Sequence, residues 1–316
     1  MKKVLLTGAT GFVGGRLAIQ LIKEGYQVKA LVRDPSRAND LAKAGVELVS
    51  GDVTDLQSIE HSLDGVEGIF HLAAIYDFGV DPEKMRQVNI EGTRNILDAA
   101  QRARINRIVY CGSDTSLGNT HGKLCDETKT HDGNHFCSAY EETKHLAHRL
   151  VIQRIQEGAP IINAIVSTVY GPGDKSAIGE FIELHLAGQL SMALDREAGY
   201  TFAHVDDVAR ALLLAYEKGT LGQSYLISGT PATFGELFDT MSSLTGIDSP
   251  KQMPKWALKF VPILIPLVGF LIGKSRAALR ELFAMGQNVT RFFSGEKHDR
   301  CSGGNLARYK LAWPKH

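Results

Sequence analysis

Over its first two-thirds the chain alternates short apolar runs, often rich in β-branched residues, with longer stretches of amphipathic helical pattern. The apolar runs read KKVLLTG, QVKALVR, VELVSGD, GIFHLAA, RIVYCGS and IINAIVSTVYG. Strands that alternate with helices predict a parallel sheet that carries helices on both of its faces. The pattern therefore predicts an α/β fold built on a doubly wound parallel sheet.

Beyond residue 170 the pattern is less regular, and proline, glycine and aromatic residues appear in short irregular stretches. One segment, residues 200–228, resumes the alternation with TFAHVDDVARALLLAYEKG and then SYLISG. We therefore expect a main domain of residues 1–170, to which residues 200–228 return. Residues 171–199 and 229–316 are expected to form a smaller lobe.

A glycine-rich segment, TGATGFVG at residues 7–14, directly follows the first apolar run and opens a helical pattern. Gly8 permits a tight turn, Gly11 lets the backbone approach a pyrophosphate, and Gly14 allows close packing of helix and strand. The helix N-terminus then offers free N–H groups and a positive dipole end to phosphates. The alternative is a mere tight turn, but the strand–loop–helix context favours a dinucleotide site. The residues expected to contact it are Gly8, Thr10, Gly11, Phe12, Val13 and Gly14.

The glycine segment and the motifs after it resemble those of the extended short-chain dehydrogenase/reductases, in the NAD(P)-dependent epimerase/dehydratase superfamily. TGATGFVG resembles the family's fingerprint. The motifs that follow in the family's order are GDV at 51–53, HLAA at 71–74, Asn89 within VNIEGTRN, HVDDVA at 204–209 and LAWP at 311–314. The resemblance implies that the main domain is a Rossmann domain for a nicotinamide dinucleotide and that the smaller lobe binds the substrate.

The resemblance also implies cofactor contacts outside the glycine loop. The family places an acidic side chain on the adenine amino group after the third strand, where this chain has Asp52, and uses the loop after the fourth strand as a second contact. The further residues expected at the cofactor are Arg33, Asp52, Val53, Leu72, Ala73, Ala74, Tyr140, Lys144 and Val169.

The end of the second predicted strand, KALVRDPSR, bears on which nicotinamide cofactor is used. An acidic residue there would accept hydrogen bonds from a free ribose 2′-hydroxyl, but this chain has Arg33, followed by Asp34. A guanidinium can form paired hydrogen bonds with a 2′-phosphate and stack on adenine. This favours NADP(H), as in the dihydroflavonol-reductase-like members that the stretch resembles. NAD(H) stays open, with Arg33 solvated and Asp34 at the ribose.

Tyr140 and Lys144, in SAYEETK, are four residues apart, so a helix places them on one face. The pair alone is equally typical of an ordinary helix surface. A free tyrosine has a pKa of about 10, and a neighbouring ammonium lowers it by stabilising the phenolate. Ser113 ends the strand RIVYCGS at the sheet edge where such folds bind ligands, and its place matches the family's catalytic serine. We expect Ser113 to orient a carbonyl, Tyr140 to protonate it, and Lys144 to tune Tyr140 and hold the ribose.

Two departures from the family's sugar enzymes bear on the reaction. Dehydratases carry Thr-Asp-Glu at the serine position, whereas this chain has Ser113-Asp114-Thr115, so elimination is disfavoured. Many nucleotide-sugar enzymes also place Arg-Pro where this chain has Val166-Ser167. The expected activity is therefore reduction of a ketone, or oxidation of the alcohol, as in dihydroflavonol reductases and 3β-hydroxysteroid dehydrogenases. The alternatives are a nucleotide-sugar epimerase and a non-catalytic cofactor-sensing protein, although such sensors usually lack the three residues.

The smaller lobe is rich in aromatic and aliphatic residues, which suits large hydrophobic substrates. They are Phe181, Phe202, Phe234, Phe238 and the stretch WALKFVPILIPLVGFLIGK. For most of the single aromatic residues, a place in the lobe's core is the simpler interpretation. Residues 260–273 carry no charge, but a spanning helix needs about 20 residues, and Pro262 and Pro266 interrupt this one. A buried or lid segment is expected, with membrane-surface contact as the less favoured option.

Composition and charge exclude several of the remaining classes of function. Lys and Arg number 35, as do Asp and Glu, so the formal charge is zero and nucleic-acid binding has no electrostatic basis. The N-terminus lacks the features of a signal peptide. Four cysteines without paired spacing indicate reduced thiols, as in a cytoplasmic protein. We expect a monomer or a homodimer. A histidine- and cysteine-rich stretch around Tyr140 matches no closed zinc pattern, so no metal is expected. Instead, His135 or His145 is expected at the substrate mouth.

Overall fold

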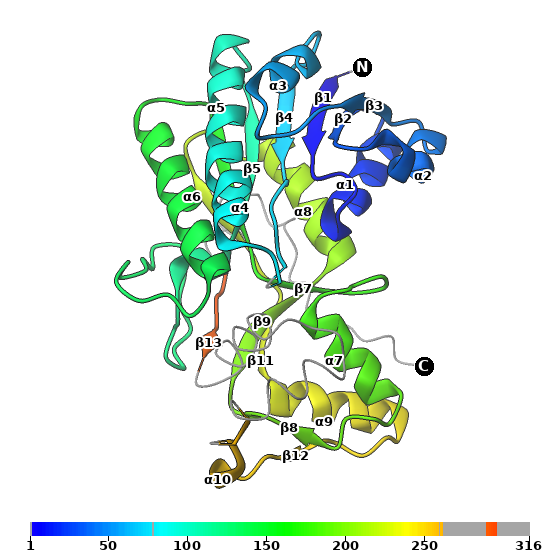
Figure 1. The fold of residues 1–316 in the computed structure, drawn as a ribbon, viewed down its shortest axis with the longest axis vertical. Helices are drawn as coiled ribbons and strands as arrows, with labels where there is room; N and C mark the ends of the chain where they lie inside the picture. Colours follow the sequence, from blue (N-terminus) through cyan, green and yellow to red (C-terminus); the bar gives the residue numbers. More distant parts are fainter. Residues whose placement is uncertain (1, 78, 259, 262–288, 296–316) are drawn as a thin grey trace.

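The computed structural model describes residues 2–77, 79–258, 260, 261 and 289–295, and Figure 1 shows their arrangement. A larger domain with a parallel sheet lies above a smaller lobe in that view. Most of the expected apolar segment 260–273, and the LAWP motif, lie outside the described residues.

The main sheet has the doubly wound parallel architecture that the sequence predicts. In the described chain, seven strands pair in the order β10-β6-β5-β4-β1-β2-β3, and every pairing is parallel. The strands are β1 (Lys3–Thr7), β2 (Gln27–Val32), β3 (Glu47–Ser50), β4 (Gly68–His71), β5 (Ile108–Ser113), β6 (Ile161–Val166) and β10 (Ser224–Ile227). The strand order reverses between β1 and β4, and ligands of such sheets bind at the carboxyl ends beside that point.

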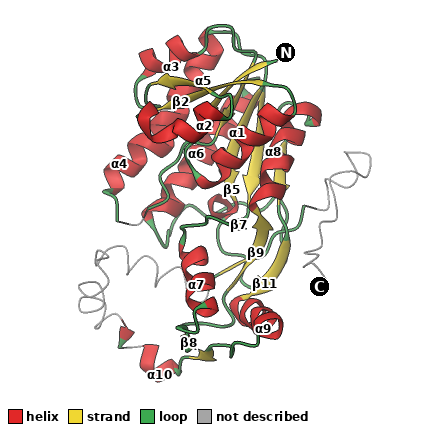
Figure 2. Cartoon of the chain, turned by 90° about the vertical axis from the view of Figure 1, so that its right-hand side faces the viewer, coloured by secondary structure: helices red, strands yellow, loops and turns green. Residues whose placement is uncertain are grey.

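Helices cover both faces of this sheet (Figure 2). The helical segments of the main domain are α1 (Phe12–Lys23), the 3₁₀ turn η1 (Pro35–Ala38), α2 (Asn39–Lys43), α3 (Leu56–Ser62), α4 (Pro82–Arg86), the π-helical turn η2 (Gln87–Glu91), α5 (Gly92–Arg102), the 3₁₀ turn η3 (Asp114–Leu117), α6 (Ala139–Gln156) and α8 (Val205–Lys218). Helices α1 and α8 contribute to one core, whereas α3, α5 and α6 contribute to the core on the opposite face.

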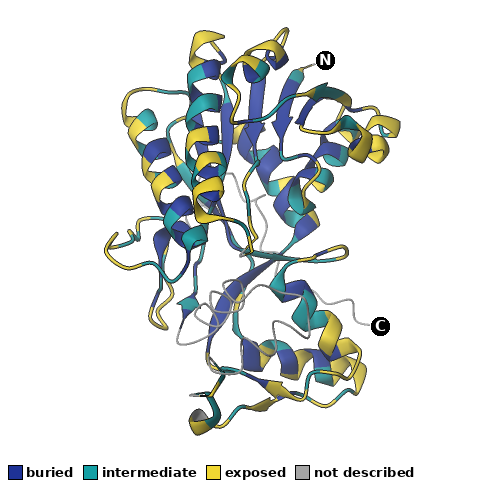
Figure 3. Ribbon diagram, in the orientation of Figure 1, coloured by how far each residue is buried: buried dark blue, intermediate teal, exposed yellow. Residues whose placement is uncertain are grey.

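Strand β1 shows why the apolar runs are continuous rather than alternating. Val4 and Leu6 point into the core with α1 and α8, while Leu5 points into the core with α3 and α5, and all three are fully buried. Successive side chains of a strand point to opposite faces, so a sheet covered on both sides needs an apolar residue at each position. Each buried leucine contributes about 1.5–3 kcal/mol. The buried strands are dark blue in Figure 3.

A second, smaller sheet links the main domain to the lobe. Its strands are β7 (Thr168–Tyr170), β9 (Gly199–His204), β11 (Thr230–Thr233) and β13 (Thr290–Arg291), with β9 paired to all three others. Within residues 200–228, α8 and β10 thus return to the main domain, whereas residues 200–204 belong to the second sheet. The lobe adds α7 (Ala177–Leu186), α9 (Phe234–Thr245), the pair β8 (Met192–Ala193) and β12 (Lys251–Gln252), and α10 (Lys255–Leu258).

The segment around β13 ties the two parts of the molecule together. The Thr290 backbone N–H and hydroxyl hydrogen-bond to the Asn119 side chain at 3.2 and 3.3 Å. Phe293 exchanges hydrogen bonds with the Thr201 hydroxyl, donating at 2.8 Å and accepting at 3.1 Å. Residues 289–295, which form this segment, therefore lie between β9 and the loop that follows η3. Across the described residues, the structure shows no helix with the length and apolarity that a membrane crossing requires.

Candidate active site

The loop between β1 and α1 has the geometry of a phosphate cradle. Gly8 adopts a left-handed φ of +74°, and a Cβ added there would lie 2.7 Å from the backbone nitrogen of Ala73. A Cβ on Gly14 would lie 2.1 Å from the Gly8 carbonyl oxygen, so only glycine permits this close contact. Gly11 is the N-cap of α1 and supplies no side-chain cap, which leaves the first N–H groups of the helix available. The loop therefore fits the pyrophosphate of a dinucleotide.

The loop after β4 lies directly against this cradle. The Ala73 N–H donates to the Thr7 hydroxyl at 3.2 Å, and the Leu72 carbonyl carbon lies where a Gly8 side chain would be. Leu72 and Ala73 thus meet the glycine loop, as expected of two loops that share one cofactor. Ala74 is the next residue along the same loop.

A buried histidine supports this junction and was not predicted. His71 hydrogen-bonds through Nδ1 to the Thr7 hydroxyl at 2.8 Å and through Nε2 to the Thr93 hydroxyl at 3.0 Å. Burial lowers the pKa of His71 to about 3, and Lys144 adds to that effect, so the ring is neutral. The sequence carried no signal for this role, because the three residues come from β1, β4 and α5.

The residues expected at the adenosine end lie at the carboxyl edge of β2 and β3. Leu31 pairs with Thr7, so Arg33 follows β2 beyond the same edge as Gly8, and its side chain is exposed. Asp34 caps η1: its carboxylate accepts from the Ser36 N–H at 3.0 Å and from the Ser36 hydroxyl at 2.6 Å. These bonds lower the pKa of Asp34.

The loop after β3 is held in place by its own side chains. The Asp52 carboxylate accepts from the backbone and hydroxyl of Thr54, at 2.8 and 2.9 Å. Val53 is buried, and its carbonyl accepts from the Asn95 amide at 3.0 Å. Val169, another residue expected at the cofactor, lies in β7 and packs against the core that contains α1 and α8.

Ser113, Tyr140 and Lys144 meet at the carboxyl end of β5, and we call them the Ser–Tyr–Lys trio. The Tyr140 hydroxyl is hydrogen-bonded to the Ser113 side chain. Lys144, one helical turn after Tyr140, is buried; its Nζ donates to the Cys111 carbonyl at 3.3 Å and lies 5.3 Å from the centre of the Tyr110 ring. The Ser138 hydroxyl caps helix α6 by accepting from the Glu141 N–H at 3.0 Å, so the helix begins directly before Tyr140 and places Tyr140 and Lys144 one turn apart.

The spacing of Tyr140 and Lys144 alone suggested that the pKa of the Tyr140 phenol would be lowered, and in the structure it is not. Burial raises the pKa of Tyr140 to about 12, whereas Lys144 and the Ser113 hydrogen bond act to lower it. The predicted influence of Lys144 thus has the expected sign, but desolvation of a buried phenolate outweighs it. Without cofactor, Tyr140 is therefore a neutral phenol throughout the physiological range.

Asn89, one of the motif residues, fixes the wall beside the trio. Its side chain accepts from the Ile75 N–H at 2.7 Å and donates to the Ile75 carbonyl and the Thr143 hydroxyl, each at 3.1 Å. The loop after β4 is thereby fastened to α6. It carries Tyr76, whose ring lies edge-on to Tyr140 with the ring centres 4.8 Å apart.

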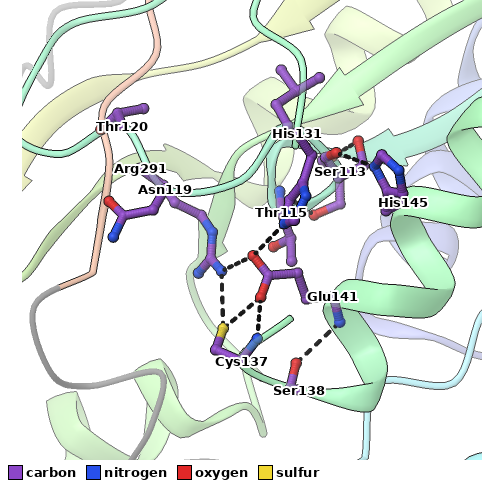
Figure 4. A network of polar contacts seen from close by, with 12 residues as sticks. Ser113, Thr115, Asn119, Thr120, His131, Cys137, Ser138, Glu141, His145 and Arg291 are labelled. Carbon is purple, nitrogen blue, oxygen red and sulfur yellow. Dashed lines mark hydrogen bonds and ion pairs between the residues drawn. The ribbon is translucent and has the colours of Figure 1, made fainter. Parts of the chain in front are cut away.

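A second cluster, beside the trio, was missed by sequence analysis (Figure 4). Arg291, on β13, is buried, and its Nη2 donates to the Glu141 carboxylate at 3.1 Å. Glu141 also accepts from the backbone N–H and thiol of Cys137, at 2.7 and 2.6 Å. Asp114, directly after Ser113, is buried in the same region: burial raises its pKa to about 7, although Arg291 opposes the rise. We call Arg291, Glu141, Cys137 and Asp114 the arginine cluster.

A cavity of about 570 Å³ opens beyond Val169, between the end of β7 and the lobe. Its wall comes mainly from the loop after β7, from α7 and α9, and from β11, with Phe202, Ile182 and Leu237 among its apolar side chains. Of the four expected lobe aromatics, Phe202 lines this cavity. The other three, Phe181, Phe234 and Phe238, pack in the lobe's core, which agrees with the simpler interpretation.

The histidine-rich stretch forms a packed layer on α6. The His131 ring stacks on Phe136 with centres 4.7 Å apart and lies 4.9 Å from the His145 ring. His145 is buried beneath it, and His135 is exposed, so His145 lies in the packing rather than at an open mouth. Over the residues with described positions, no group of three or more His, Cys, Asp or Glu side chains could hold a metal ion.

Comparisons with known proteins bear on the family and the fold. The profile of the NAD dependent epimerase/dehydratase family matches residues 4–228. The chain is 34% identical over 260 residues to a putative dihydroflavonol 4-reductase of Synechocystis sp., which covers 79% of this chain and 75% of that protein. It is 31% identical over 250 residues to a 3-beta-hydroxysteroid dehydrogenase of Mycolicibacterium neoaurum, covering 74% and 68%.

Solved structures show the same architecture. The crystal structure of gox2253 superposes with a TM-score of 0.80 at 33% identity, covering 96% of this chain and 93% of that one. A UDP-glucose 4-epimerase from Thermotoga maritima superposes with a TM-score of 0.73 at 22% identity, covering 94% and 91%. At that identity the second likeness concerns the fold alone.

Proposed function

Because the chain belongs to the NAD-dependent epimerase/dehydratase family, and is thus an NAD(P)-dependent oxidoreductase, we propose that it interconverts a ketone and an alcohol on a hydrophobic small molecule with NADP(H). The observation that carries the proposal is the hydrogen bond between Tyr140 and Ser113 with the Lys144 ammonium one turn behind it. This arrangement offers a proton donor and a second hydroxyl to one substrate oxygen.

Each residue of the trio has its own role in the proposed reaction. A nicotinamide held by the glycine loop and the trio would supply the hydride and, once oxidised, a positive charge. Ser113 orients the substrate carbonyl, and Tyr140, neutral because its pKa is raised to about 12, donates the proton to the carbonyl oxygen. Lys144 favours the phenolate that remains after the transfer, and it holds the ribose.

We assign the binding residues from the resemblance to the family, and the geometry of the glycine loop supports the pyrophosphate contacts. Gly8, Thr10, Gly11, Phe12, Val13 and Gly14 would hold the pyrophosphate, Asp52 and Val53 the adenine, and Leu72, Ala73, Ala74 and Val169 the segment that leads to the nicotinamide. Residues 171–199 and 229–316 would bind the substrate, with the apolar cavity beyond Val169 as its site.

The preference for NADP(H) rests on Arg33 and on the state of Asp34. Arg33 is exposed at the edge where the adenosine ribose would lie. Asp34, the residue that could instead serve a free 2′-hydroxyl, already caps η1 through Ser36. A 2′-phosphate is therefore the better match for this edge.

The two alternatives are less well supported. A nucleotide-sugar epimerase would need polar groups for its sugar, but the cavity wall is largely apolar. A non-catalytic cofactor sensor would have no use for a buried Tyr140–Ser113 hydrogen bond with a buried lysine behind it.

Steady-state turnover tests the proposal. Oxidation of NADPH should accelerate when hydrophobic aryl, steroid or long-chain ketones are added, and NADH should be a poorer donor. UDP-sugars in the presence of NAD⁺ provide the competing arm. Epimerised sugar without ketone-dependent loss of NADPH would exclude the proposed reaction.

A further inference from the structure

Arg291 is a buried cation whose hydrogen-bonding capacity is only partly used. Its side chain is 1% exposed, and Nη2 makes its hydrogen bonds to Glu141 and, at 3.7 Å, to the Cys137 sulfur. Nothing in the part of the chain that the structure describes accepts a hydrogen bond from Nε or Nη1. Buried donors without an acceptor are costly and uncommon in native proteins, so these two groups call for a ligand.

The guanidinium is held in place by the contacts of β13 on both of its sides. Arg291 pairs with Tyr200 across β13 and β9, and its guanidinium carbon lies 5.6 Å from the centre of the Tyr200 ring. The neighbouring Thr290 is fastened to the loop after η3 through Asn119 and Thr120. A two-residue strand clamped on both sides fixes the guanidinium before any ligand arrives.

Two electrostatic neighbours connect Arg291 to the reacting groups. Asp114, which interacts with Arg291, is the residue directly after Ser113. The hydroxyl of Tyr76 is within electrostatic range of Arg291 and Tyr200, and the Tyr76 ring packs edge-on against Tyr140. Arg291 and the trio thus share two neighbours, Asp114 and Tyr76.

We propose that Arg291 anchors a carboxylate carried by the substrate, so that the preferred substrates are keto acids or hydroxy acids with an apolar body. A guanidinium is the side chain best suited to an ionised carboxylate. Glu141 keeps Arg291 oriented by occupying Nη2 and leaves Nε and Nη1 for the ligand. Tyr200, which contacts the guanidinium, lies against Phe202 with the ring centres 6.4 Å apart, and Phe202 lines the apolar cavity, which would receive the hydrocarbon part. This inference refines the substrate class of the proposed function, on which it rests.

Binding of an unreactive carboxylate tests this without relying on turnover. Decanoate and its uncharged methyl ester are titrated by calorimetry into the protein saturated with NADPH. Wild-type protein should bind decanoate at least about 10-fold more tightly than the ester, since charge-assisted bonds to a buried guanidinium are lost with the ester.

The double variant Arg291→Met/Glu141→Gln removes both members of the buried ion pair, so no charge is left uncompensated. It should bind decanoate no better than the ester. Arg86→Met/Glu142→Gln is the matched control. Arg86, on α4, forms an ion pair at 2.8 Å with Glu142, the residue that follows Glu141 on α6. The control should keep the wild-type discrimination. Equal binding of decanoate by wild type and by the Arg291 double variant would overturn the proposal, as would equal affinity of wild type for acid and ester.

Should the double variant fail to fold, Arg291→Lys keeps the charge and has fewer donors in a different geometry. It should raise KM for a long-chain keto acid about 10-fold and leave kcat and the KM of the keto ester near wild type. A change in kcat for both substrates, with no difference in KM, would contradict carboxylate anchoring. Decanoate bound through Arg291 in a protein that turns over no ketone would refute the proposed reductase function and leave the carboxylate site standing.

Discussion

At the scale of single residues, the balance of forces on Tyr140 determines what the site can do. Burial raises the pKa of its phenol to about 12, against the opposing influence of Lys144 and Ser113. The proposed ketone reduction requires a neutral phenol, so Tyr140 would be ready to donate a proton at neutral pH. Alcohol oxidation needs the phenolate, and its rate should therefore rise as the pH rises toward the pKa of Tyr140.

Lys144→Met should shift that rise to higher pH. Removing the ammonium takes away an influence that lowers the pKa of Tyr140, and a shift of one unit lowers the oxidation rate about 10-fold at a fixed pH below the pKa. The pH dependence of kcat/KM with NADP⁺ measures the shift. Cofactor affinity should fall with it, because Lys144 is also the proposed ribose contact. An unchanged profile would mean that Lys144 does not act on Tyr140.

The site residues that the sequence predicted and that lie together in the structure share one property: their spacing along the chain carries the information. Tyr140 and Lys144 lie one helical turn apart, and Ser113 ends a recognisable strand. Arg291 gave no such signal, because its strand has two residues and its partner Glu141 is 150 positions away. The net pKa of Tyr140 was also beyond prediction, since burial depends on packing that no local pattern encodes.

At the scale of elements, the β1–α1 unit offers a sharp test of the glycine loop. Gly11→Val should abolish cofactor binding in a folded protein, because the branched side chain would occupy the path of the pyrophosphate. A Cβ on Gly11 would make a tight contact of 3.1 Å with the Gly8 carbonyl oxygen, so circular dichroism must first show that the variant folds.

Gly15→Val is the matched control, one turn from the cap, where a Cβ would make an ordinary 3.5 Å contact with the Ala9 oxygen. It should bind NADPH nearly as wild type does in calorimetry. Retained affinity in Gly11→Val, with a native circular dichroism spectrum, would show that the loop does not hold the phosphates.

The elements of the main sheet were predictable because most of its strands are short, mainly apolar runs that alternate with helices along the chain. The second sheet was not. β7 and β9 read as part of the main domain, yet they pair with each other and with β11 and β13. Strand pairing in this sheet joins residue 168 to residue 202 and residue 199 to residue 290, and contacts over such separations leave no periodicity in the sequence.

At the scale of the whole molecule, cofactor binding should appear as added stability. A ligand that binds only the folded chain stabilises it by about 2.7 kcal/mol at 100 times its Kd, so the melting temperature reports relative affinity. NADPH should raise the melting temperature more than NADH does at equal concentration, and Arg33→Asp should reverse that order by repelling the 2′-phosphate.

Arg104→Asp makes the same change of charge at an exposed residue between α5 and β5, near the opposite edge of the sheet. It should leave the NADPH preference intact. Equal shifts with the two cofactors in the wild-type protein would remove the NADP(H) assignment and leave the wider NAD(P) assignment unaffected.

The central claim is that the Tyr140 hydroxyl delivers the proton during hydride transfer, and a single-turnover measurement tests it most directly. Enzyme saturated with NADPH is mixed with a hydrophobic ketone, and loss of NADPH absorbance is followed for wild type, Tyr140→Phe and Tyr110→Phe. Tyr110 is a matched control: it is buried, Lys144 lies over its ring, and its hydroxyl has no hydrogen-bond partner within the described chain. Tyr140→Phe should bind NADPH normally and transfer hydride about 10²–10⁴-fold more slowly, while Tyr110→Phe stays near wild type. Hydride transfer by Tyr140→Phe at the wild-type rate would contradict the account.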